Sequence, residues 1–331
     1  MSEPIEDTRK KTYEKDVSIV IPLLNEQESL PELTRRINEA LSSQYSYEII
    51  FIDDGSDDGS WDQIRELAGE NHDIRGVRFH RNYGKSTALQ VGFTEACGEY
   101  VVTMDADLQD DPAEVPDMVA MLQDGYELVS GWKKKRYDPV SKTIPSRFFN
   151  KVTSYVTGIP LHDFNCGLKA YQSKVVKRLR LYGELHRYVP LLANWEGFTY
   201  IGEKVVHHHP RKYGKTKFGF SRFARGFLDL LTILFINNYL QRPMHFFGGF
   251  GILFLLVGGG ISGYLAALKL FFNESLSNRP LLLLGILLMV LGVQFFSIGF
   301  LGELMNRNKE TMRKPNIQNT IRAINRETTK S

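Results

Sequence analysis

The sequence predicts an α/β domain with a mostly parallel sheet, followed by a helical hairpin that crosses a membrane. Three observations predict this fold. Short apolar runs rich in β-branched residues alternate with segments of helical periodicity between residues 17 and 131. Acidic or turn-forming residues follow these runs, and two long apolar stretches come later in the chain. Alternation of this kind favours right-handed crossovers between parallel strands, and such sheets bind ligands beyond the carboxyl ends of their strands.

The first strand is expected over residues 17–24, where VSIVIPLL is a continuous apolar run typical of a strand buried on both faces. A helical pattern follows over residues 29–41, with Pro31 in the first turn, a position that proline tolerates well. The second strand is expected over residues 48–53 and ends at the turn sequence DDGSDDGS. These elements predict the start of a βαβ unit.

The following elements repeat this alternation. We expect further helices over residues 60–67, 85–97 and 113–123, and further strands over residues 74–80, 99–105 and 127–131. The segments PLLNE, DDGSDDGS and DADLQ stand at the carboxyl ends of three strands. We therefore expect these segments to meet at one edge of the sheet and to form the site.

The composition of the chain limits the functional classes to which it can belong. The mean hydropathy of −0.24 averages a polar part up to residue 243 and a strongly apolar part after it. The net charge is only +3, so the chain is not a general polyanion binder and no nucleic-acid partner is expected. Cys97 and Cys166 lack metal-ligand spacing and indicate a reducing compartment. The N-terminal residues contain no apolar segment, so we expect no cleavable signal peptide.

Two apolar stretches, residues 246–272 and 281–302, each have about the length needed to cross a hydrocarbon core of roughly 30 Å. Basic residues flank the pair on both outer sides, whereas the connector over 273–280 is short. By the positive-inside rule the polar domain and both termini are cytoplasmic, which predicts a multi-pass protein of the inner (cytoplasmic) membrane. A buried hairpin in a soluble core is the alternative, and the tight connection of two such long runs disfavours it.

Residues 221–240 alternate arginine with large apolar side chains at helical spacing. Arg222 and Arg225 would meet lipid headgroups while the apolar side chains enter the membrane interface. The alternative is an amphipathic helix packed on the polar domain. The neighbouring membrane span favours the interfacial interpretation.

Asp105 and Asp107 follow a strand and can converge on one hard cation, with Gln109 adding a further oxygen. Oxygen ligands favour Mg²⁺ or Mn²⁺ over zinc, and such a metal would bridge a diphosphate. A solvated acidic turn is the alternative for this DxD pattern alone. The other two acidic strand ends favour the metal site.

The second strand end carries Asp53 and Asp54, whose carboxylates can accept hydrogen bonds from a ribose or a base. Turn capping is the competing interpretation, and it is favoured for Asp57 and Asp58. The segment RNYGKS at 81–86 ends like a P-loop, but Phe79 stands where the first glycine is needed. We therefore exclude an NTPase, although Lys85 at a helix start can still approach phosphate.

Three consecutive histidines at 207–209 could indicate a metal. Consecutive residues on a strand point to alternating faces, so a structural role is favoured.

Five motifs, taken in their order along the chain, resemble those of a known family. They are PLLNE at 22–26, DDGSDDGS at 53–60, RNYGKSTAL at 81–89, DADLQDDP at 105–112 and DFNCGLKAY at 163–171. They resemble the family 2 glycosyltransferases of the GT-A fold. More narrowly, they are similar to dolichol-phosphate mannose synthases and bacterial undecaprenyl-phosphate sugar transferases. The resemblance covers roughly residues 15–220, and the two C-terminal spans match the usual architecture of the bacterial branch.

The resemblance implies roles for individual residues. A metal would be held by Asp105, Asp107 and Gln109. The nucleotide-sugar would contact Pro22, Leu24, Glu26, Asp53, Asp54, Lys85 and Ala106, with Arg211 and Lys217 of a basic loop closing over the phosphates. The acceptor phosphate would contact Lys133 and Arg147, and Asp163 lies in a motif near the reaction centre.

The resemblance also implies an inverting, metal-dependent transfer of a sugar to polyisoprenyl (undecaprenyl) phosphate. UDP-glucose is the default donor, GDP-mannose is possible, and a homo-oligomer in contact with membrane lipids is expected. A processive polysaccharide synthase is one alternative, but a QxxRW-type motif and further spans are not seen in the sequence. A non-catalytic nucleotide-sugar-binding subunit is the other, and the intact Asp105 and Asp107 pair argues against it.

These inferences predict the organisation of the whole chain. We expect a flexible N-terminus (1–15), a GT-A catalytic domain (16–220), a juxtamembrane amphipathic segment (221–243), a first span (244–272), an extracytoplasmic loop (273–280), a second span (281–305) and a basic cytoplasmic tail (306–331).

Overall fold

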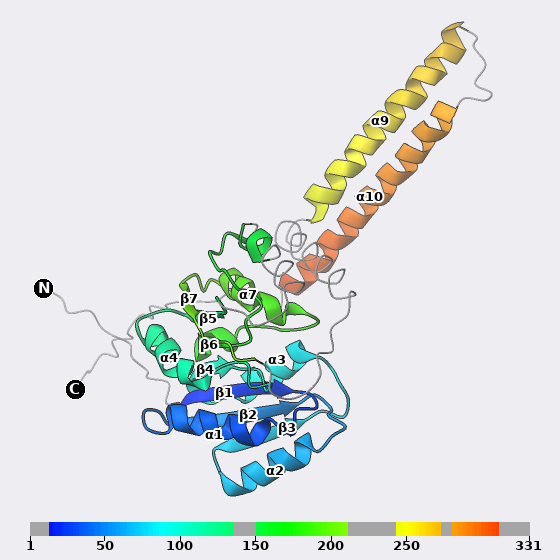
Figure 1. Ribbon diagram of the computed structural model, residues 1–331. Coiled ribbons are helices and arrows are strands. Elements are labelled where there is room, and N and C mark those ends of the chain that lie inside the picture. Colours follow the sequence, from blue (N-terminus) through cyan, green and yellow to red (C-terminus); the bar gives the residue numbers. More distant parts are fainter. Residues whose placement is uncertain (1–12, 135–149, 156, 211–242, 273–279, 311–331) are drawn as a thin grey trace, which may run out of the picture. The chain divides into compact units, whose positions relative to one another are not determined.

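The computed structural model describes residues 13–134, 150–155, 157–210, 243–272 and 280–310 (Figure 1). The chain forms two units, residues 1–226 and 227–331, which are described separately. The strands are β1 (Lys15–Leu23), β2 (Tyr47–Asp53), β3 (Ile74–Arg78), β4 (Gly98–Thr103), β5 (Leu128–Trp132), β6 (Lys169–Gln172) and β7 (Ile201–Val205). The helices of the first unit are α1 (Leu30–Leu41), α2 (Ser60–Glu70), α3 (Lys85–Glu95), α4 (Val115–Gln123), α6 (Ser173–Val176) and α7 (Val189–Trp195), with 3₁₀ turns η1 (Pro112–Glu114) and η2 (Leu185–Tyr188).

The described strands form one seven-stranded sheet in the order β3-β2-β1-β4-β6-β5-β7. All pairs are parallel except those of β6, which runs antiparallel to β4 and β5. The predicted α/β fold with a mostly parallel sheet is therefore confirmed. Sequence patterns did not assign β6 and β7, because these short strands carry charged residues and lack a long apolar run.

Each predicted helix and strand up to residue 131 is present, with shifted ends. Helix α3 ends at Glu95 and not at Cys97, because Ala96 has extended backbone angles (φ −60°, ψ 129°) and leads into β4. Strand β4 ends at Thr103, so Asp105 lies in the loop beyond it. The prediction that the three histidines alternate along a strand is wrong, because β7 ends at Val205; beyond it, His208 forms an isolated bridge to Asp110.

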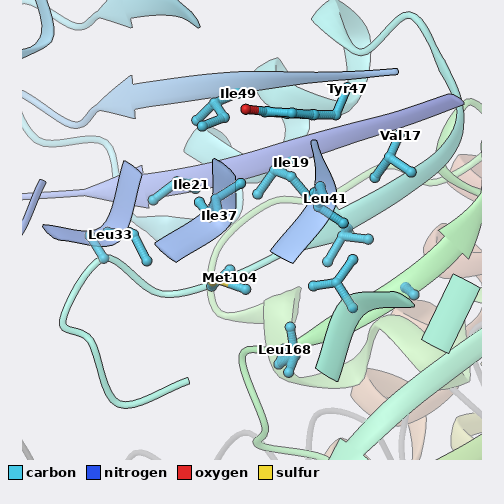
Figure 2. Packing of buried hydrophobic residues seen from close by; sticks show 14 of the residues in the cluster. Val17, Ile19, Ile21, Leu33, Ile37, Leu41, Tyr47, Ile49, Met104 and Leu168 are labelled. Carbon is cyan, nitrogen blue, oxygen red and sulfur yellow. The ribbon is translucent and has the colours of Figure 1, made fainter. Parts of the chain in front are cut away.

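Both faces of the sheet are covered, which explains the unbroken apolar runs of β1 and β2. On one face Ile19 and Ile21 pack with Leu33 and Ile37 of α1 (Figure 2). On the other face Val20, Ile50 and Ile52 pack with Ala88, Leu89 and Phe93 of α3. Alternation along each strand sends neighbouring residues to opposite faces, so the strand has no polar side.

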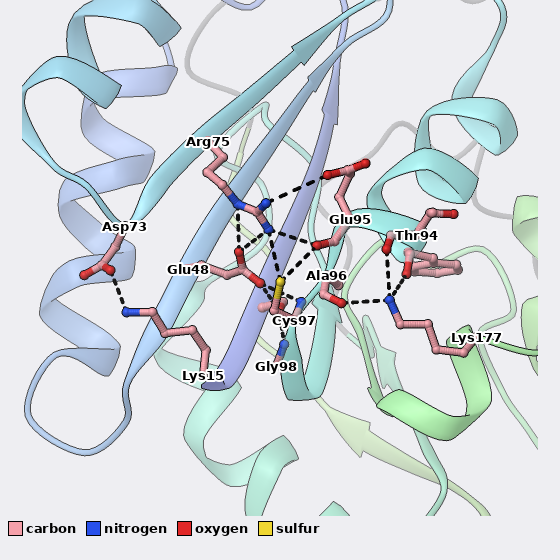
Figure 3. Close-up of polar contacts among 12 residues, drawn as sticks. Lys15, Glu48, Asp73, Arg75, Thr94, Glu95, Ala96, Cys97, Gly98 and Lys177 are labelled. Carbon is pink, nitrogen blue, oxygen red and sulfur yellow. Dashed lines mark hydrogen bonds and ion pairs between the residues drawn. The ribbon is translucent and has the colours of Figure 1, made fainter. Parts of the chain in front are cut away.

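A buried carboxylate ties together the edge of the sheet at which β4 begins (Figure 3). Glu48 is 5% exposed and pairs with Arg75, and it accepts hydrogen bonds from the Ser18 hydroxyl and, at 2.8 Å, from the Cys97 N–H. At the nearby end of α3, the ammonium group of Lys177 donates to the carbonyl oxygens of residues 93, 94 and 96. A cation at this position satisfies carbonyls that the helix leaves unpaired.

The second unit contains helices α9 (Pro243–Phe272) and α10 (Pro280–Glu310), which pack against each other. Over Pro243–Phe272 and Pro280–Met305 both helices are long and apolar enough to cross a membrane. Only 17% and 11% of the residues in their most apolar windows are buried, so these helices are not the core of a soluble bundle within the described chain.

Glycines form the contact between α9 and α10. A Cβ atom at Gly258 would lie 2.6 Å from the carbonyl oxygen of Gly285, and one at Gly251 would lie 2.9 Å from that of Gly292. The two backbones therefore approach more closely than any other residue allows, as is usual where helices pack in a bilayer.

Replacing one of these glycines by alanine should separate the helices. We expect Gly258→Ala to lower the midpoint of thermal unfolding in detergent, because overpacking costs about 1–3 kcal/mol. Gly260→Ala is the matched control: a Cβ there meets nothing within 4 Å, and alanine favours helix over glycine. Equal midpoints for the two variants would contradict the close packing.

Candidate functional site

The carboxyl ends of β1, β2 and β3 lie side by side, because Leu23 pairs with Asp53 and Asp53 pairs with Arg78 in parallel register. The loops beyond these strands therefore meet at one edge. Their contact is close: a Cβ at Gly55 (φ 78°) would lie 2.5 Å from the backbone carbon of Arg81. Only glycine fits this turn, because its φ angle is in the left-handed region and no side chain has space.

Asp54 joins the end of β2 to the start of α3. This carboxylate is 5% exposed and accepts hydrogen bonds from the N–H groups of Tyr83 (2.7 Å) and Gly84 (2.9 Å). Burial raises the pKa of Asp54, the two N–H groups act in the opposite direction, and the net shift is upward. Gly84 has a φ of 91°, and α3 begins at the next residue, Lys85. Asp54 thus builds the loop that presents Lys85.

The ammonium group of Lys85 forms an ion pair with the carboxylate of Asp105, and both side chains are about one-third exposed. Burial alone would raise the pKa of Asp105, but the charges of Lys85 and Lys133 lower it to about 2. Asp105 is therefore ionised at neutral pH. The pair brings together two residues that the sequence predicts to contact a nucleotide-sugar.

The segment 163–167 packs directly against the side chain of Asp105. A Cβ at Gly167 would lie 2.6 Å from Oδ2 of Asp105, so only glycine allows this approach. The Thr103 hydroxyl donates to the carbonyl oxygen of Gly167 (2.9 Å). Lys169 is 3% exposed, and its ammonium group donates to the carbonyls of Phe164 (3.2 Å) and Cys166. Burial lowers the pKa of Lys169.

Asp107 and Gln109 lie in the same loop as Asp105. Asp107 Oδ1 accepts a hydrogen bond from the Gln109 N–H (3.2 Å), and the Gln109 carbonyl accepts one from the His209 N–H (2.9 Å). No group of three or more His, Cys, Asp or Glu side chains suited to a metal occurs within the described ranges. Two carboxylates and an amide nevertheless fit Mg²⁺ or Mn²⁺, because such ions commonly take only one or two carboxylates and share the rest of their shell with phosphate oxygens and water.

Lys133 lies in this site, but its charge is already paired. Its ammonium group is 2.7 Å from Oδ1 of Asp110, and the side chains are 13% and 0% exposed. Burial alone would lower the pKa of Lys133, and the carboxylate of Asp110 raises it above its ordinary value. The buried pair joins the end of β5 to the DADLQD loop. Asp110 was not among the residues that the sequence analysis selected, and its strand-end position was the available signal.

The other candidate residues lie at the end of β1, in buried positions, or outside the described part of the chain. Pro22 lies in β1, and Leu24 and Glu26 lie just beyond its end. The backbone of Glu26 is held by hydrogen bonds with the hydroxyl groups of Ser60 and Ser29. Asp53 and Ala106 are buried, and Asp53 accepts from the Ser56 N–H (2.8 Å). Asp163 is fully buried and accepts from the Asn165 N–H (3.1 Å). Arg147, Arg211 and Lys217 lie outside the described residues.

The predicted structural roles of several polar residues are confirmed. Asp58 accepts from the Ser60 N–H (2.9 Å), as expected for turn capping. His207 and His209 contact Glu114 (2.6 Å) and Asp111 (3.0 Å) and thereby tie the chain before residue 211 to the segment 111–114.

A cleft of about 450 Å³ opens beside the end of β3, outside the DADLQD loop. It is lined by Gly55, Ser56, Trp61, Arg78, Phe79 and His80. The guanidinium group of Arg78 is already committed, because it donates to the Ser56 carbonyl (3.0 Å) and lies 3.4 Å from Asp53 Oδ2.

His186 and Ser86 lie at the same edge, beside Lys85, and sequence reasoning did not select them. Ser86 follows Lys85 in α3, and its hydroxyl contacts both the backbone N–H and the ring of His186. The two residues are a hundred positions apart, and no local pattern indicates their contact.

The sequence matches a known protein family and several known proteins. Residues 18–180 match the family model for glycosyl transferase family 2. The chain is 37% identical over 310 residues to a dodecaprenyl-phosphate galacturonate synthase of Rhizobium johnstonii, with 92% of each chain covered. It is also 37% identical to an undecaprenyl-phosphate 4-deoxy-4-formamido-L-arabinose transferase of Shewanella sediminis, covering 88% of this chain and 87% of that protein.

Among solved structures, glucosyl-3-phosphoglycerate synthase of Mycobacterium tuberculosis in complex with phosphoglyceric acid has a TM-score of 0.51 at 20% identity. The match covers 67% of this chain and 79% of that one. The same enzyme in complex with Mn²⁺, UDP and glucosyl-3-phosphoglycerate gives a TM-score of 0.51 at 18% identity, over the same shares of the two chains. This likeness shows a shared fold.

Asp54→Asn should loosen the start of α3. The amide keeps one acceptor and turns an NH₂ group towards a backbone N–H, and an unpaired buried group costs about 1–3 kcal/mol. We expect faster hydrogen exchange of the amides of residues 83–86, measured by mass spectrometry, and a lower unfolding midpoint. Asp62→Asn is the control, because that side chain is 72% exposed. Unchanged exchange in Asp54→Asn would contradict the junction.

Lys133→Met should destabilise the domain, because it leaves Asp110 buried without its cation, at a cost of about 3–5 kcal/mol. Thermal unfolding measures this loss, and Lys134→Met, an exposed neighbour, should have almost no effect. If Lys133 instead served only to bind a ligand, its replacement would raise a KM and leave the unfolding midpoint unchanged.

Proposed function

The chain belongs to glycosyltransferase family 2, and from this membership we propose that it transfers a sugar from a nucleotide-sugar to a polyprenyl phosphate in the membrane. The observation that carries the proposal is the similarity over 92% of both chains to a protein named dodecaprenyl-phosphate galacturonate synthase. A match over such a length includes the apolar C-terminal part of this chain, where α9 and α10 lie. The acidic loop with Lys85 at the carboxyl edge of the sheet supplies groups suited to a diphosphate.

The donor is proposed to bind at this edge. Pro22, Leu24, Glu26, Asp53 and Ala106 would contact the nucleoside, while Asp54 acts by building the loop before Lys85. Asp105 and Asp107 with Gln109 would hold Mg²⁺ or Mn²⁺, which when bound neutralises charge on a diphosphate. Lys85, Arg211 and Lys217 would place further positive charge beside the departing nucleoside diphosphate.

The acceptor needs little activation. A phosphate monoester has a second pKa near 6, so the lipid phosphate is largely a dianion at neutral pH and is already a nucleophile. One of its oxygens would attack the anomeric carbon while the bond to the nucleoside diphosphate breaks and the diphosphate leaves with the electron pair. In-line attack inverts the anomeric configuration. The protein's contribution is then to position the two substrates.

The buried pair of Lys133 and Asp110 changes the proposed acceptor contacts. Because Lys133 is committed to Asp110, we assign it to holding the loop, and Arg147 is the acceptor contact that we retain from the sequence. The buried carboxylate of Asp163 is held by the Asn165 N–H, so we give it a positioning role and not that of a base.

The membrane hairpin is proposed to keep the active site at the bilayer, since a polyprenyl tail does not leave it. We place the catalytic domain (16–220), the segment 221–243, the tail (306–331) and both termini on the cytoplasmic side of an inner membrane, with the loop 273–280 outside, by the positive-inside rule. A homo-oligomer remains part of the proposal.

The donor sugar has three candidates. UDP-glucose is the donor expected from the sequence, and GDP-mannose is a further candidate. The two relatives carry the names of galacturonate and 4-deoxy-4-formamido-L-arabinose, which adds UDP-galacturonate to the donors to be tested. A processive synthase and a non-catalytic binding subunit are the alternatives, and turnover of a lipid acceptor distinguishes all three.

The test uses the full-length protein in detergent with undecaprenyl phosphate, Mg²⁺ or Mn²⁺, and radiolabelled UDP-glucose, UDP-galacturonate or GDP-mannose. We expect label from one donor in the butanol-extractable lipid. Asp107→Ala should reduce transfer by about 10²-fold or more, and EDTA should abolish it. Asp62→Ala, an exposed carboxylate on α2, should transfer normally. Nucleotide binding without lipid label from any donor would contradict a lipid acceptor, and label in a long polymer would identify a processive synthase.

A further inference from the structure

His186 is attached to the active-site edge through a single hydroxyl group. The Ser86 hydroxyl oxygen accepts a hydrogen bond from the backbone N–H of His186 (3.0 Å) and lies 3.1 Å from Nδ1 of its ring. Ser86 is fully buried in the first turn of α3, next to Lys85. The contact therefore joins η2 to the first turn of α3, directly beside Lys85, which pairs with Asp105.

This double contact determines which ring nitrogen carries the proton. The Ser86 oxygen already accepts the backbone N–H, and the hydroxyl proton needs an acceptor because Ser86 is buried. Within the described chain the acceptor in reach is Nδ1 of His186. Nδ1 is then unprotonated, and the proton of the neutral ring is on Nε2.

The ring remains neutral in this place. Burial, and then the charges of Lys85 and Arg187, lower the pKa of His186 to about 2. His186 is therefore neutral near pH 7, and it offers an uncharged N–H donor. Nε2 makes no hydrogen bond to any residue that the structure describes, and part of the residue is exposed to solvent.

We propose that the Nε2–H group of His186 binds an oxygen of the transferred sugar and contributes to the choice of donor. This inference rests on the proposed function. The position favours the sugar because the neighbouring cation, Lys85, and the candidate metal ligands already provide for the anionic diphosphate. An uncharged donor suits a hydroxyl or carboxylate oxygen of a sugar, and a site that pairs such an oxygen discriminates strongly against sugars that lack it.

The alternative is a tether, in which His186 serves only to attach η2 to α3. Two substitutions separate the roles because they imitate different ring nitrogens. The amide of His186→Asn lies near the position of Nδ1, so it can keep the contact with Ser86 but has no donor at Nε2. The amide nitrogen of His186→Gln lies near the position of Nε2 and can donate to a sugar oxygen.

The experiment compares wild type, His186→Asn, His186→Gln and the control His72→Gln, whose histidine is exposed in the turn after α2. Calorimetry measures the Kd for UDP and for UDP-glucose, with UDP-galacturonate in a parallel series, and the transfer assay gives kcat and KM. We expect His186→Asn to weaken binding of the transferred donor about 10-fold, as for one lost hydrogen bond, with UDP affinity within about 2-fold of wild type. His186→Gln should recover most of the donor affinity.

The outcomes separate this inference from the function on which it rests. A tether would show the opposite order, with His186→Asn close to wild type and His186→Gln impaired and less stable in thermal unfolding. Equal losses for UDP and for the nucleotide-sugar would assign the contact to the nucleotide and overturn the inference. If wild type transfers no sugar to lipid, the proposed function fails, whatever the variants do.

Discussion

The carboxylate of Asp54 joins the end of β2 to the start of α3, and the rest of the site is arranged from this junction. Its two hydrogen bonds to the N–H groups of Tyr83 and Gly84 set where α3 begins. The first residues of that helix, Lys85 and Ser86, then reach Asp105 and His186. One buried acceptor thus positions groups from four parts of the chain. The carboxylate that the sequence predicts to contact a nucleotide-sugar thus also serves as a structural link.

Buried charges of both signs hold the loops around this edge. Lys133 and Asp110 join β5 to the DADLQD loop, and Lys169 holds the segment 163–167 through two carbonyls. Placing charges in a protein interior is costly, and apolar side chains would often give equal stability. The charged groups instead add hydrogen bonds and ion pairs that fix the loops in defined orientations. Gly167, for example, can lie against Asp105 only if its loop is held in one position.

The membrane hairpin follows a different principle. In lipid there is no hydrophobic gain from pairing two apolar helices, so the helices associate through close contact of their backbones. Gly251 and Gly258 on α9 meet Gly292 and Gly285 on α10 at a seven-residue spacing. The hairpin therefore depends on the absence of side chains at a few positions, whereas the soluble domain depends on filling both faces of its sheet.

The sequence by itself determined the α/β class, the strand ends at which the candidate site lies, the two apolar helices and the family. These features depend on hydrophobic periodicity, turn residues and short motifs, all of which are local properties of the chain. The partner of each charge was decided only by the tertiary structure. Lys133 was expected to meet an acceptor phosphate and is buried against Asp110, and His186 was not selected because its partner, Ser86, is a hundred residues away. Such pairings depend on the register of the strands and on the packing of distant loops. They cannot be predicted from local sequence patterns, because the two partners are far apart in the chain.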